Sequence, residues 1–252
     1  MNRLLRSAAT VMAGFVAANL VGLLRQIIIN RTFGTSAELD AYFAAFRVPD
    51  LLFTVIAGGA LGSAFIPMFT GFLDDSRERA WRLASAVINN LLIALCVIAG
   101  LAALAAPLLV RTVLAPGFSP EYQLLTANLM RVMLISTVIF GVSGLLMGIH
   151  NAHHHFLSPA IAPIAYNVGI IGGALIGQGQ PQGLPLRGVY GLAWGVVAGA
   201  ALHLIIQLPA LIQHKPIYTF TLDLRDAAVR QVGKLMLPRM FGLAVWQFNF
   251  WI

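Results

Sequence analysis

Six charged residues stand within, or at the ends of, long apolar stretches of this sequence. A charged side chain at the centre of a bilayer costs at least about 2.5–3.5 kcal/mol on insertion scales, so such residues usually face a protein interior or a watery cavity. Four of the six are basic and two are acidic. Because arginine matches phosphate geometry with paired donors, the positive excess favours an anionic, phosphate-bearing ligand. The six are Arg25, Asp40, Arg47, Asp50, Arg131 and Arg239.

Helical spacing relates several of these charges to one another. Asp40 and Arg47 are seven residues apart, which places them on one face of a helix. Arg47 and Asp50 are three residues apart and within reach of a direct pair. Pro49 lies between them and predicts a bend, because proline removes a backbone hydrogen bond. A bent helix beside a charge cluster is typical of a transport site.

Two interpretations of these charges stay open. For Arg25, Asp40 and Asp50, which lie near the ends of their stretches, local ion pairing or extension toward the interface is an equal alternative to a cavity role. Arg47 and Arg131 lie deeper along their helices, and a cavity role is favoured for both.

The composition indicates which elements must position these residues. The chain has 252 residues, of which 59% are hydrophobic and 10% charged, and its mean hydropathy is +0.83. Soluble domains carry about 25% charged residues, so this chain has too few charges to cover a soluble surface. The net charge of +7 does not indicate nucleic-acid binding, since no basic run interleaves with aromatic residues. We therefore predict an all-α, polytopic helical membrane protein.

Hydrophobic stretches long enough to cross a bilayer, about 20 residues, recur along the chain. They are too long, and alternate too little, for strands of a barrel. A cleaved signal peptide is disfavoured because the hydrophobic pattern continues beyond the first stretch. We predict a six-helix transmembrane unit over residues 1–213, a cytoplasmic linker over 214–232 and a partial seventh transmembrane helix over 233–252. The six stretches are residues 7–24, 51–73 (with a helix starting near 37), 83–110, 122–149, 156–178 and 188–213.

The basic residues that flank these stretches predict a cytoplasmic N-terminus. With that orientation three of them lie outside, at Arg31, Arg111 and Arg187. Nine lie inside, at Arg3, Arg6, Arg77, Arg79, Arg82, Lys215, Arg225, Arg230 and Lys234.

Other reactive residue types give little indication of chemistry. Four histidines crowd residues 150–155, but contiguous histidines cannot all converge on one metal ion, so we expect a solvated loop and no metal site. Cys96 lies in an apolar run and is interpreted as a packing residue. The sequence lacks the common hydrolase, metalloprotease and phosphate-loop motifs. We therefore expect neither an enzyme nor a bound cofactor.

Small residues predict close helix contacts. Glycines four residues apart allow helix backbones to approach each other in a membrane. Such pairs occur at Gly58/Gly62, Gly144/Gly148, Gly169/Gly173 and Gly195/Gly199.

Several segments, in order and at matching spacing, resemble the MurJ (MviN) lipid II flippases of the MOP exporter superfamily. The resemblance covers essentially the whole chain. It implies two lobes of six helices around a central cavity, with two further C-terminal helices. It also implies movement of the undecaprenyl-pyrophosphate-linked peptidoglycan precursor, lipid II, across the bacterial cytoplasmic membrane by alternating access. The segments are RQIIINRTFG (25–34), DAYFAAFRVPDLL (40–52), GALGSAFIP (59–67), APGF (115–118), residues 151–163 and LPRMFGLAVWQ (237–247).

This chain resembles the first lobe and the start of helix 7, so the resemblance implies a C-terminal lobe as partner, together with a lipid-linked anionic precursor and membrane lipids. It implies structural or coupling roles for Asp40, Asp50 and Pro49. It implies contact with the anionic cargo for Arg25, Arg47, Arg131 and Asn19.

The chain departs from the family pattern at three positions. Asn19 and Phe53 stand where the family has arginines, and Gly58 stands where it has a glutamate. Lipid II is the expected cargo. The alternatives left open are another polyprenyl-linked glycan, a cation-coupled exporter of the MATE type, and an inactive truncated product.

Overall fold

The computed structural model describes residues 3–60, 65–179 and 187–249 of the chain. Within these ranges it contains helices and no strands, which confirms the all-α prediction. A π-helical turn over Val110–Leu114 extends α4. The helices are α1 (Arg3–Phe33), α2 (Ala37–Ala60), α3 (Ile66–Asp75), α4 (Arg77–Leu109), α5 (Pro120–Ala152), α6 (Leu157–Gly179), α7 (Val189–Ile205), α8 (Leu208–Gln213) and α9 (Ala227–Asn249).

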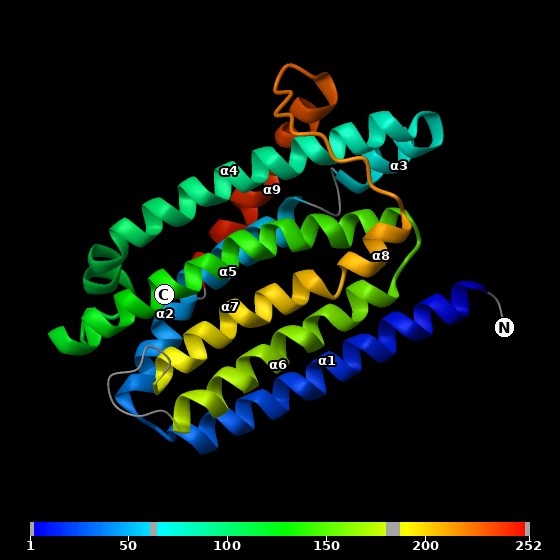
Figure 1. Cartoon of the computed structure of the whole chain (residues 1–252). Helices are drawn as coiled ribbons and strands as arrows, with labels where there is room; N and C mark the ends of the chain where they lie inside the picture. The colour runs from blue at the N-terminus through cyan, green and yellow to red at the C-terminus, as the bar shows by residue number, and fades with distance from the viewer. Residues whose placement is uncertain (1–2, 61–64, 180–186, 250–252) are drawn as a thin grey trace.

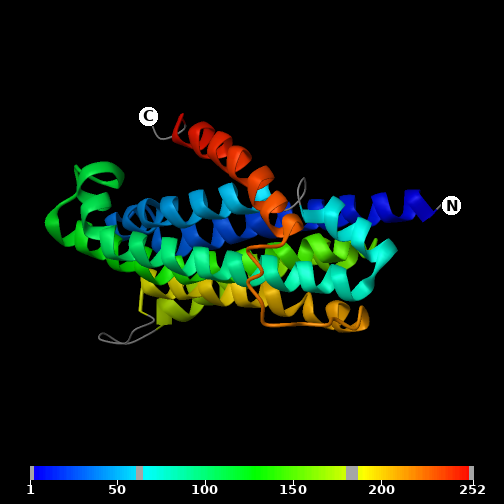
Figure 2. The ribbon, with the colours of Figure 1, turned by 90° about the horizontal axis from the view of Figure 1, so that it is seen from above.

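The long helices lie side by side in an elongated bundle (Figure 1). Helix α6 packs against α1 and α7, and α5 packs against α2, α4 and α7. The short helices α3 and α8 lie at the same end of the bundle as the N-terminus. Seen from above, α9 diverges from the other helices (Figure 2), although its first half contacts α2 and α4.

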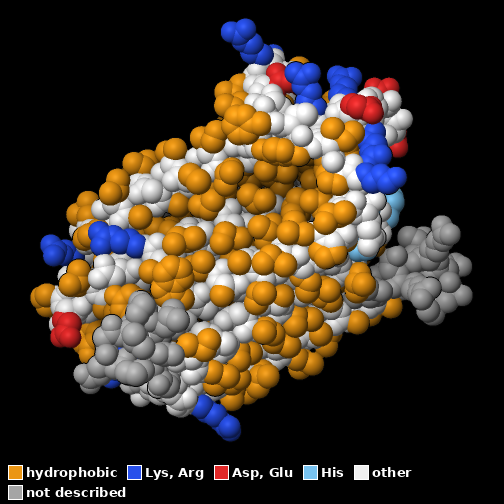
Figure 3. All heavy atoms as spheres, viewed as in Figure 1, with side chains coloured by type: hydrophobic (Ala, Val, Ile, Leu, Met, Phe, Trp, Pro, Cys, Tyr) orange, Lys and Arg blue, Asp and Glu red, His pale blue; other side chains and the backbone are white. Residues whose placement is uncertain are grey.

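Five helical segments are long and apolar enough to cross a membrane. They coincide with five of the six predicted stretches. Their outer faces expose large apolar side chains such as Phe15 (69% exposed) and Leu104 (79%), and hydrophobic atoms cover much of the face in Figure 3. The five are Val11–Phe33, Arg77–Leu114, Pro120–Ala152, Leu157–Gln178 and Val189–Gln213.

The stretch predicted over residues 51–73 contains four positions, 61–64, that lie outside the described residues. On either side of them, helix α2 covers Ala37–Ala60, beginning where expected, and α3 covers Ile66–Asp75. The seventh apolar stretch belongs to α9. Its start at Ala227 is capped by Asp226, whose Oδ1 accepts the backbone N–H of Ala228 at 2.6 Å.

Two glycine pairs bring α6 and α7 into backbone contact, as their spacing predicts. A Cβ added at Gly169 would collide with the backbone of Gly199. A Cβ at Gly173 would collide with the carbonyl oxygen of Gly191 and come within 2.6 Å of the Gly195 Cα. The pair that begins at Gly58 includes position 62, which lies outside the described residues.

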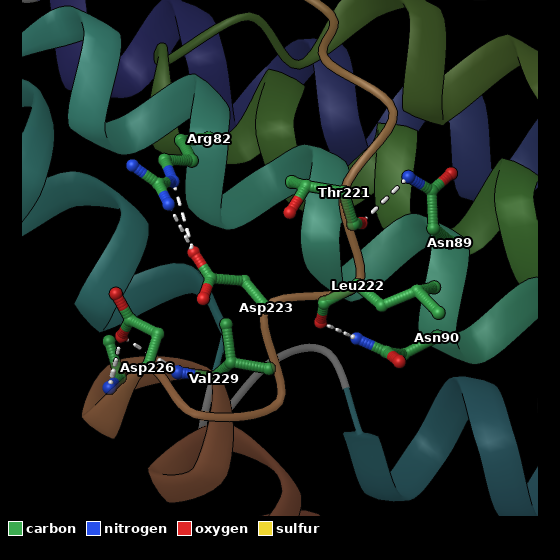
Figure 4. A network of polar contacts seen from close by, with 9 residues as sticks. Arg82, Asn89, Asn90, Thr221, Leu222, Asp223, Asp226 and Val229 are labelled. Atoms are coloured by element: carbon green, nitrogen blue, oxygen red, sulfur yellow. Dashed lines mark hydrogen bonds and ion pairs between the residues drawn. The ribbon is translucent and has the colours of Figure 1, made fainter.

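The segment 215–226, which we call the strap, lies along the N-terminal part of α4 (Figure 4). It has no helical hydrogen bonds of its own, and polar side chains of α4 satisfy its backbone instead. The Arg82 guanidinium also binds the Asp223 carboxylate, with Nη2 and Oδ2 2.7 Å apart. The bonds to the strap backbone are Asn89 Nδ2 to Thr221 O (2.9 Å), Asn90 Nδ2 to Leu222 O (2.5 Å) and Thr219 N to Ser85 Oγ (3.2 Å).

Candidate functional site

A groove of about 900 Å³ runs between α1 and the facing ends of α5 and α6. Most of its lining is apolar, including Phe15 and Leu23 of α1. Each helix also contributes polar side chains: Asn19 and Arg25 from α1, Asn151 from α5 and Asn167 from α6. An elongated apolar wall with a few polar groups suits an amphiphile whose headgroup is hydrogen-bonded.

A second cavity of about 380 Å³ lies between α1, α2, α5, α6 and α7. Arg25 lines both this cavity and the groove. The half-buried Asp50 and the buried Pro49 of α2 line the second cavity with it. The arginine Nε is buried and has no hydrogen-bond partner in the part of the chain that the structure describes. A buried guanidinium nitrogen without a partner is costly, so Arg25 is suited to receive an acceptor from a ligand.

Aromatic rings form one wall of the second cavity. The ring centroids of Phe53 and Phe140 lie 4.7 Å apart, and those of Phe140 and Tyr166 lie 4.9 Å apart. Phe53 stands at a position where the family that the sequence resembles has an arginine. The α2 side of the cavity therefore presents an apolar surface beside Asp50, while Arg25 and His203 line the cavity from α1 and α7.

A buried polar network next to this wall was not found from the sequence. The Nδ1 of His203 in α7 lies 2.6 Å from the Ser143 hydroxyl of α5. Gln207 donates from Nε2 to the same hydroxyl at 2.7 Å and to the His203 carbonyl at 2.9 Å. The sequence contains no signal for this network, because His203 stands alone in an apolar run. Its partner Ser143 lies sixty residues away in the sequence.

The remaining predicted charges lie apart from Arg25. Asp40 and Arg47 are exposed on α2 and line neither cavity. Arg131 is also exposed; its Nε donates to the Ala103 carbonyl and its Nη1 to Asn128 Oδ1, both at 3.0 Å. The structure thus brings Arg25 together with Asn19 at the groove and with Pro49 and Asp50 at the second cavity. Arg239 lies in α9, and its side chain is outside the described part of the structure.

The structure contradicts two predictions, that of a solvated histidine loop and that of a packed Cys96. The loop at residues 150–155 is not solvated: His150 is fully buried, and His153 and His155 are half-buried. Side chains of α3 and α4 and the end of α8 pack over it, which the local sequence could not reveal. Cys96 is exposed on α4 instead of packed. No group of histidine, cysteine or acidic residues in the described ranges could hold a metal ion.

Comparisons with known proteins identify related sequences over nearly the whole chain. The family model "Lipid II flippase MurJ" matches residues 29–252. The lipid II flippase MurJ of Burkholderia cenocepacia is 31% identical over 98% of this chain and 48% of its own length. The probable lipid II flippase MurJ of Bdellovibrio bacteriovorus is 31% identical over 98% of this chain and 47% of its own length. The chain spans about half the length of these curated relatives.

Solved structures share the fold. A structure of lipid II flippase MurJ in an inward closed conformation superposes with a TM-score of 0.75 at 24% identity, covering 96% of this chain and 49% of that one. A MATE crystal structure in complex with MaD3S has a TM-score of 0.74 at 19% identity, covering 97% of this chain and 53% of that one. These likenesses show that the described bundle shares its fold with about half of each of these two chains.

Proposed function

Because the chain belongs to the lipid II flippase MurJ family, we propose that it forms the first lobe of a two-lobed transporter that flips lipid II across the bacterial cytoplasmic membrane. The role is one of transport and not of catalysis. The observation that carries the proposal is Arg25, whose half-buried guanidinium lines a groove that is otherwise mostly apolar. A pyrophosphate linked to a polyprenyl chain has the same division between an anionic head and an apolar tail.

In this proposal Arg25 binds the pyrophosphate and Asn19 assists from the same face of the groove. Charge-assisted bonds from arginine to phosphate are about twice as strong as neutral ones. The polyprenyl chain lies along the apolar side chains of α1, many of which are exposed. Asp50 and Pro49 line the second cavity together with Arg25, so a change in α2 around Pro49 would alter that cavity.

The exposed charges Asp40, Arg47 and Arg131 then take part once a second lobe is present. Arg47 and Arg131 add positive charge for the cargo, and Asp40 has a structural or coupling role. In this proposal a second lobe follows α9, in keeping with relatives that are about twice as long as this chain. Alternating access requires both lobes, because one lobe has nothing to close against.

The N-terminus lies on the cytoplasmic side in this proposal. The start of α1 is at the same end of the bundle as α3 and α8 (Figure 1), and Lys215 and Arg77 of that end lie close together. In Figure 3 several Lys and Arg side chains cluster at the upper right, and fewer are visible at the left and lower edges. Positively charged flanks are retained in the cytoplasm during insertion.

Binding in lipid nanodiscs tests the proposal on the chain itself. Undecaprenyl pyrophosphate is compared with undecaprenol, which has the same tail and no anionic head. We expect much tighter binding of the pyrophosphate, and loss of that preference in Arg25→Gln. Equal affinity for both lipids would contradict the assignment of the groove.

Transport requires a complete protein and is tested in a chimera. Residues 1–252 replace the first half of the Burkholderia cenocepacia relative, and the chimera is expressed in cells depleted of their own lipid II flippase. We expect growth and appearance of lipid II in the outer leaflet. A chimera that accumulates in the membrane and binds the pyrophosphate, but never flips lipid II, would contradict the proposed cargo.

A further inference from the structure

Five of the six histidines of the chain gather at the end of the bundle where the strap begins. Four of their rings pack together, although one of them is separated from the others by about sixty residues of sequence. The rings of His153 and His214 stack in parallel, with centroids 4.0 Å apart and planes 7° apart. His150 and His155 approach the His214 ring with centroids at 5.7 Å and 6.0 Å.

Three buried ring nitrogens in this cluster have no hydrogen-bond partner in the described ranges. His150 Nε2 lies 3.1 Å from the Gln207 carbonyl oxygen, which can only accept, so the proton of this ring is on Nε2 and its Nδ1 is a bare acceptor. That Nδ1, His153 Nε2 and His214 Nε2 are all buried without a hydrogen-bond partner among the described residues. Such groups call for a specific occupant, and basic nitrogens with free lone pairs are sites at which a proton binds.

The cluster also forms a mechanical junction. His214 caps the C-terminus of α8, and the strap follows directly. The Arg77 guanidinium of α4 donates through Nη2 to the carbonyl oxygens of His214 and Lys215, at 2.6 and 2.5 Å. The other ring of the stack, His153, packs on Trp81 of α4 and edge-on against Phe69 of α3. The His153–His214 contact therefore joins the α5 end to the point where the strap starts.

The surroundings keep the stacked rings neutral. Burial, followed by the nearby charges of His214, Arg77 and His154, lowers the pKa of His153 to about 4. Burial, and then His155, lowers the pKa of His214 as well. These neighbours are all basic, so a proton taken up here gains no counter-charge from them. A second proton would place two imidazolium rings face to face beside Arg77.

We propose that this histidine cluster is a proton-binding site that latches the strap: the neutral rings hold the His153–His214 stack closed, and protons from the adjacent aqueous phase bind the ring nitrogens and open it. No covalent bond other than N–H forms. A ring released to water regains its ordinary pKa of about 6.5, whereas His153 in the closed stack has one of about 4. Opening therefore occurs between these values as the pH falls. The proposal does not depend on which lipid the groove binds.

Hydrogen exchange of the strap amides tests this latch in the full chain in nanodiscs. Peptides covering residues 214–222 are compared at about pH 7.5 and about pH 5.5, on either side of the free histidine pKa, after correction for the intrinsic exchange rates. We expect protection to fall at least about ten-fold at the lower pH, the change that corresponds to one pKa unit. Unchanged protection in the natural sequence would overturn the proposal.

Matched variants separate titration from packing. His153→Phe with His214→Phe keeps a ring stack that cannot bind protons, and its strap should stay protected at both pH values. His154→Asn is the control, because His154 is exposed at a positive φ of 55° that asparagine tolerates. It leaves the ring stack in place and removes only the weakest of the charges that lower the His153 pKa, so the fall in strap protection at the lower pH should persist. The same pH response in the double phenylalanine variant would overturn the proposal.

Two further measurements guard against misfolding and against a metal. If the double variant fails to fold, ring-nitrogen NMR titration of the natural sequence replaces it. We expect at least one ring of the stacked pair to titrate below the ordinary histidine range, and titration of both as free histidines would refute the latch. Protection that rises with added Zn²⁺ at neutral pH, and falls again with a chelator, would replace the proton site with a metal site.

Discussion

The groove around Arg25 and the strap along α4 differ in whether their buried polar groups have hydrogen-bond partners. In the groove, the Arg25 Nε is buried with no hydrogen-bond partner among the described residues, beside an open volume. Along the strap, the buried Asn89 uses both ends of its amide, accepting from Tyr218 at 2.8 Å and donating to Thr221 at 2.9 Å. A buried polar atom that has no hydrogen-bond partner and adjoins free space is suited to bind a ligand. A buried polar group whose hydrogen bonds are all made within the protein is typical of a structural contact. Substitutions in the two regions should accordingly affect binding in one and stability in the other.

The largest expected effect comes from Gly173→Leu, which damages the frame that both regions share. The new side chain would meet backbone atoms of Gly191 and Gly195, which cannot move aside as a flexible side chain does, so we expect a loss above about 3 kcal/mol. The yield of monodisperse protein and its unfolding temperature measure this. Gly172→Leu is the control on the same helix, since a Cβ added there would meet no described residue of another helix within 4 Å. Equal tolerance of both variants would contradict the α6–α7 contact.

Arg25→Gln should affect binding and leave the fold intact. Hydrogen bonds to charged groups contribute about 1.5–3 kcal/mol, so we expect roughly ten-fold to hundred-fold weaker binding of undecaprenyl pyrophosphate. The unfolding temperature should stay the same or rise, because a half-buried charge is removed. Arg31→Gln, exposed at the end of α1, serves as control with unchanged binding. A large loss of stability in Arg25→Gln would show that the arginine is structural.

The sequence singled out two of the cavity residues but gave no signal for the strap. The cost of charge in lipid drew attention to Arg25 and Asp50, although ion pairing remained an equal alternative to a cavity role, and the structure places both beside the second cavity. The strap depends on contacts between residues more than 130 positions apart, such as Arg82 and Asp223, and no local pattern encodes such pairs.

The histidines show this limit most directly. His150 and His153 stand in a short polar run, which is typical of a solvated loop. Their burial depends on His214 and Trp81, which come from other parts of the chain. The shared cavity expected for Arg47 and Arg131 stays a prediction, since both side chains are exposed in this single lobe.

Asn89→Ala should have the next largest effect, confined to stability. It leaves the Thr221 carbonyl and the Tyr218 hydroxyl without their partner, at a cost of about 1–3 kcal/mol. Hydrogen exchange over the strap should rise, while binding of undecaprenyl pyrophosphate stays unchanged. Asn30→Ala, exposed on α1, should change stability by less than about 0.5 kcal/mol. Weaker lipid binding in Asn89→Ala would mean that the two regions are coupled.

The smallest effect should come from the ion pair at the same joint. The side chains of Arg82 and Asp223 are 64% and 20% exposed, so water and salt screen their attraction, and exposed pairs contribute about 0–1 kcal/mol. A double-mutant cycle of Arg82→Gln and Asp223→Asn measures the coupling through strap exchange. It should shrink further at about 1 M salt, where the screening length is about 3 Å. A coupling as large as the Asn89 effect, and insensitive to salt, would mean that the charge pair and not the buried amides holds the strap. Both regions would then depend on a charged side chain, the strap on the Arg82–Asp223 pair and the groove on Arg25. The difference in hydrogen bonding between the two regions would no longer explain their different roles.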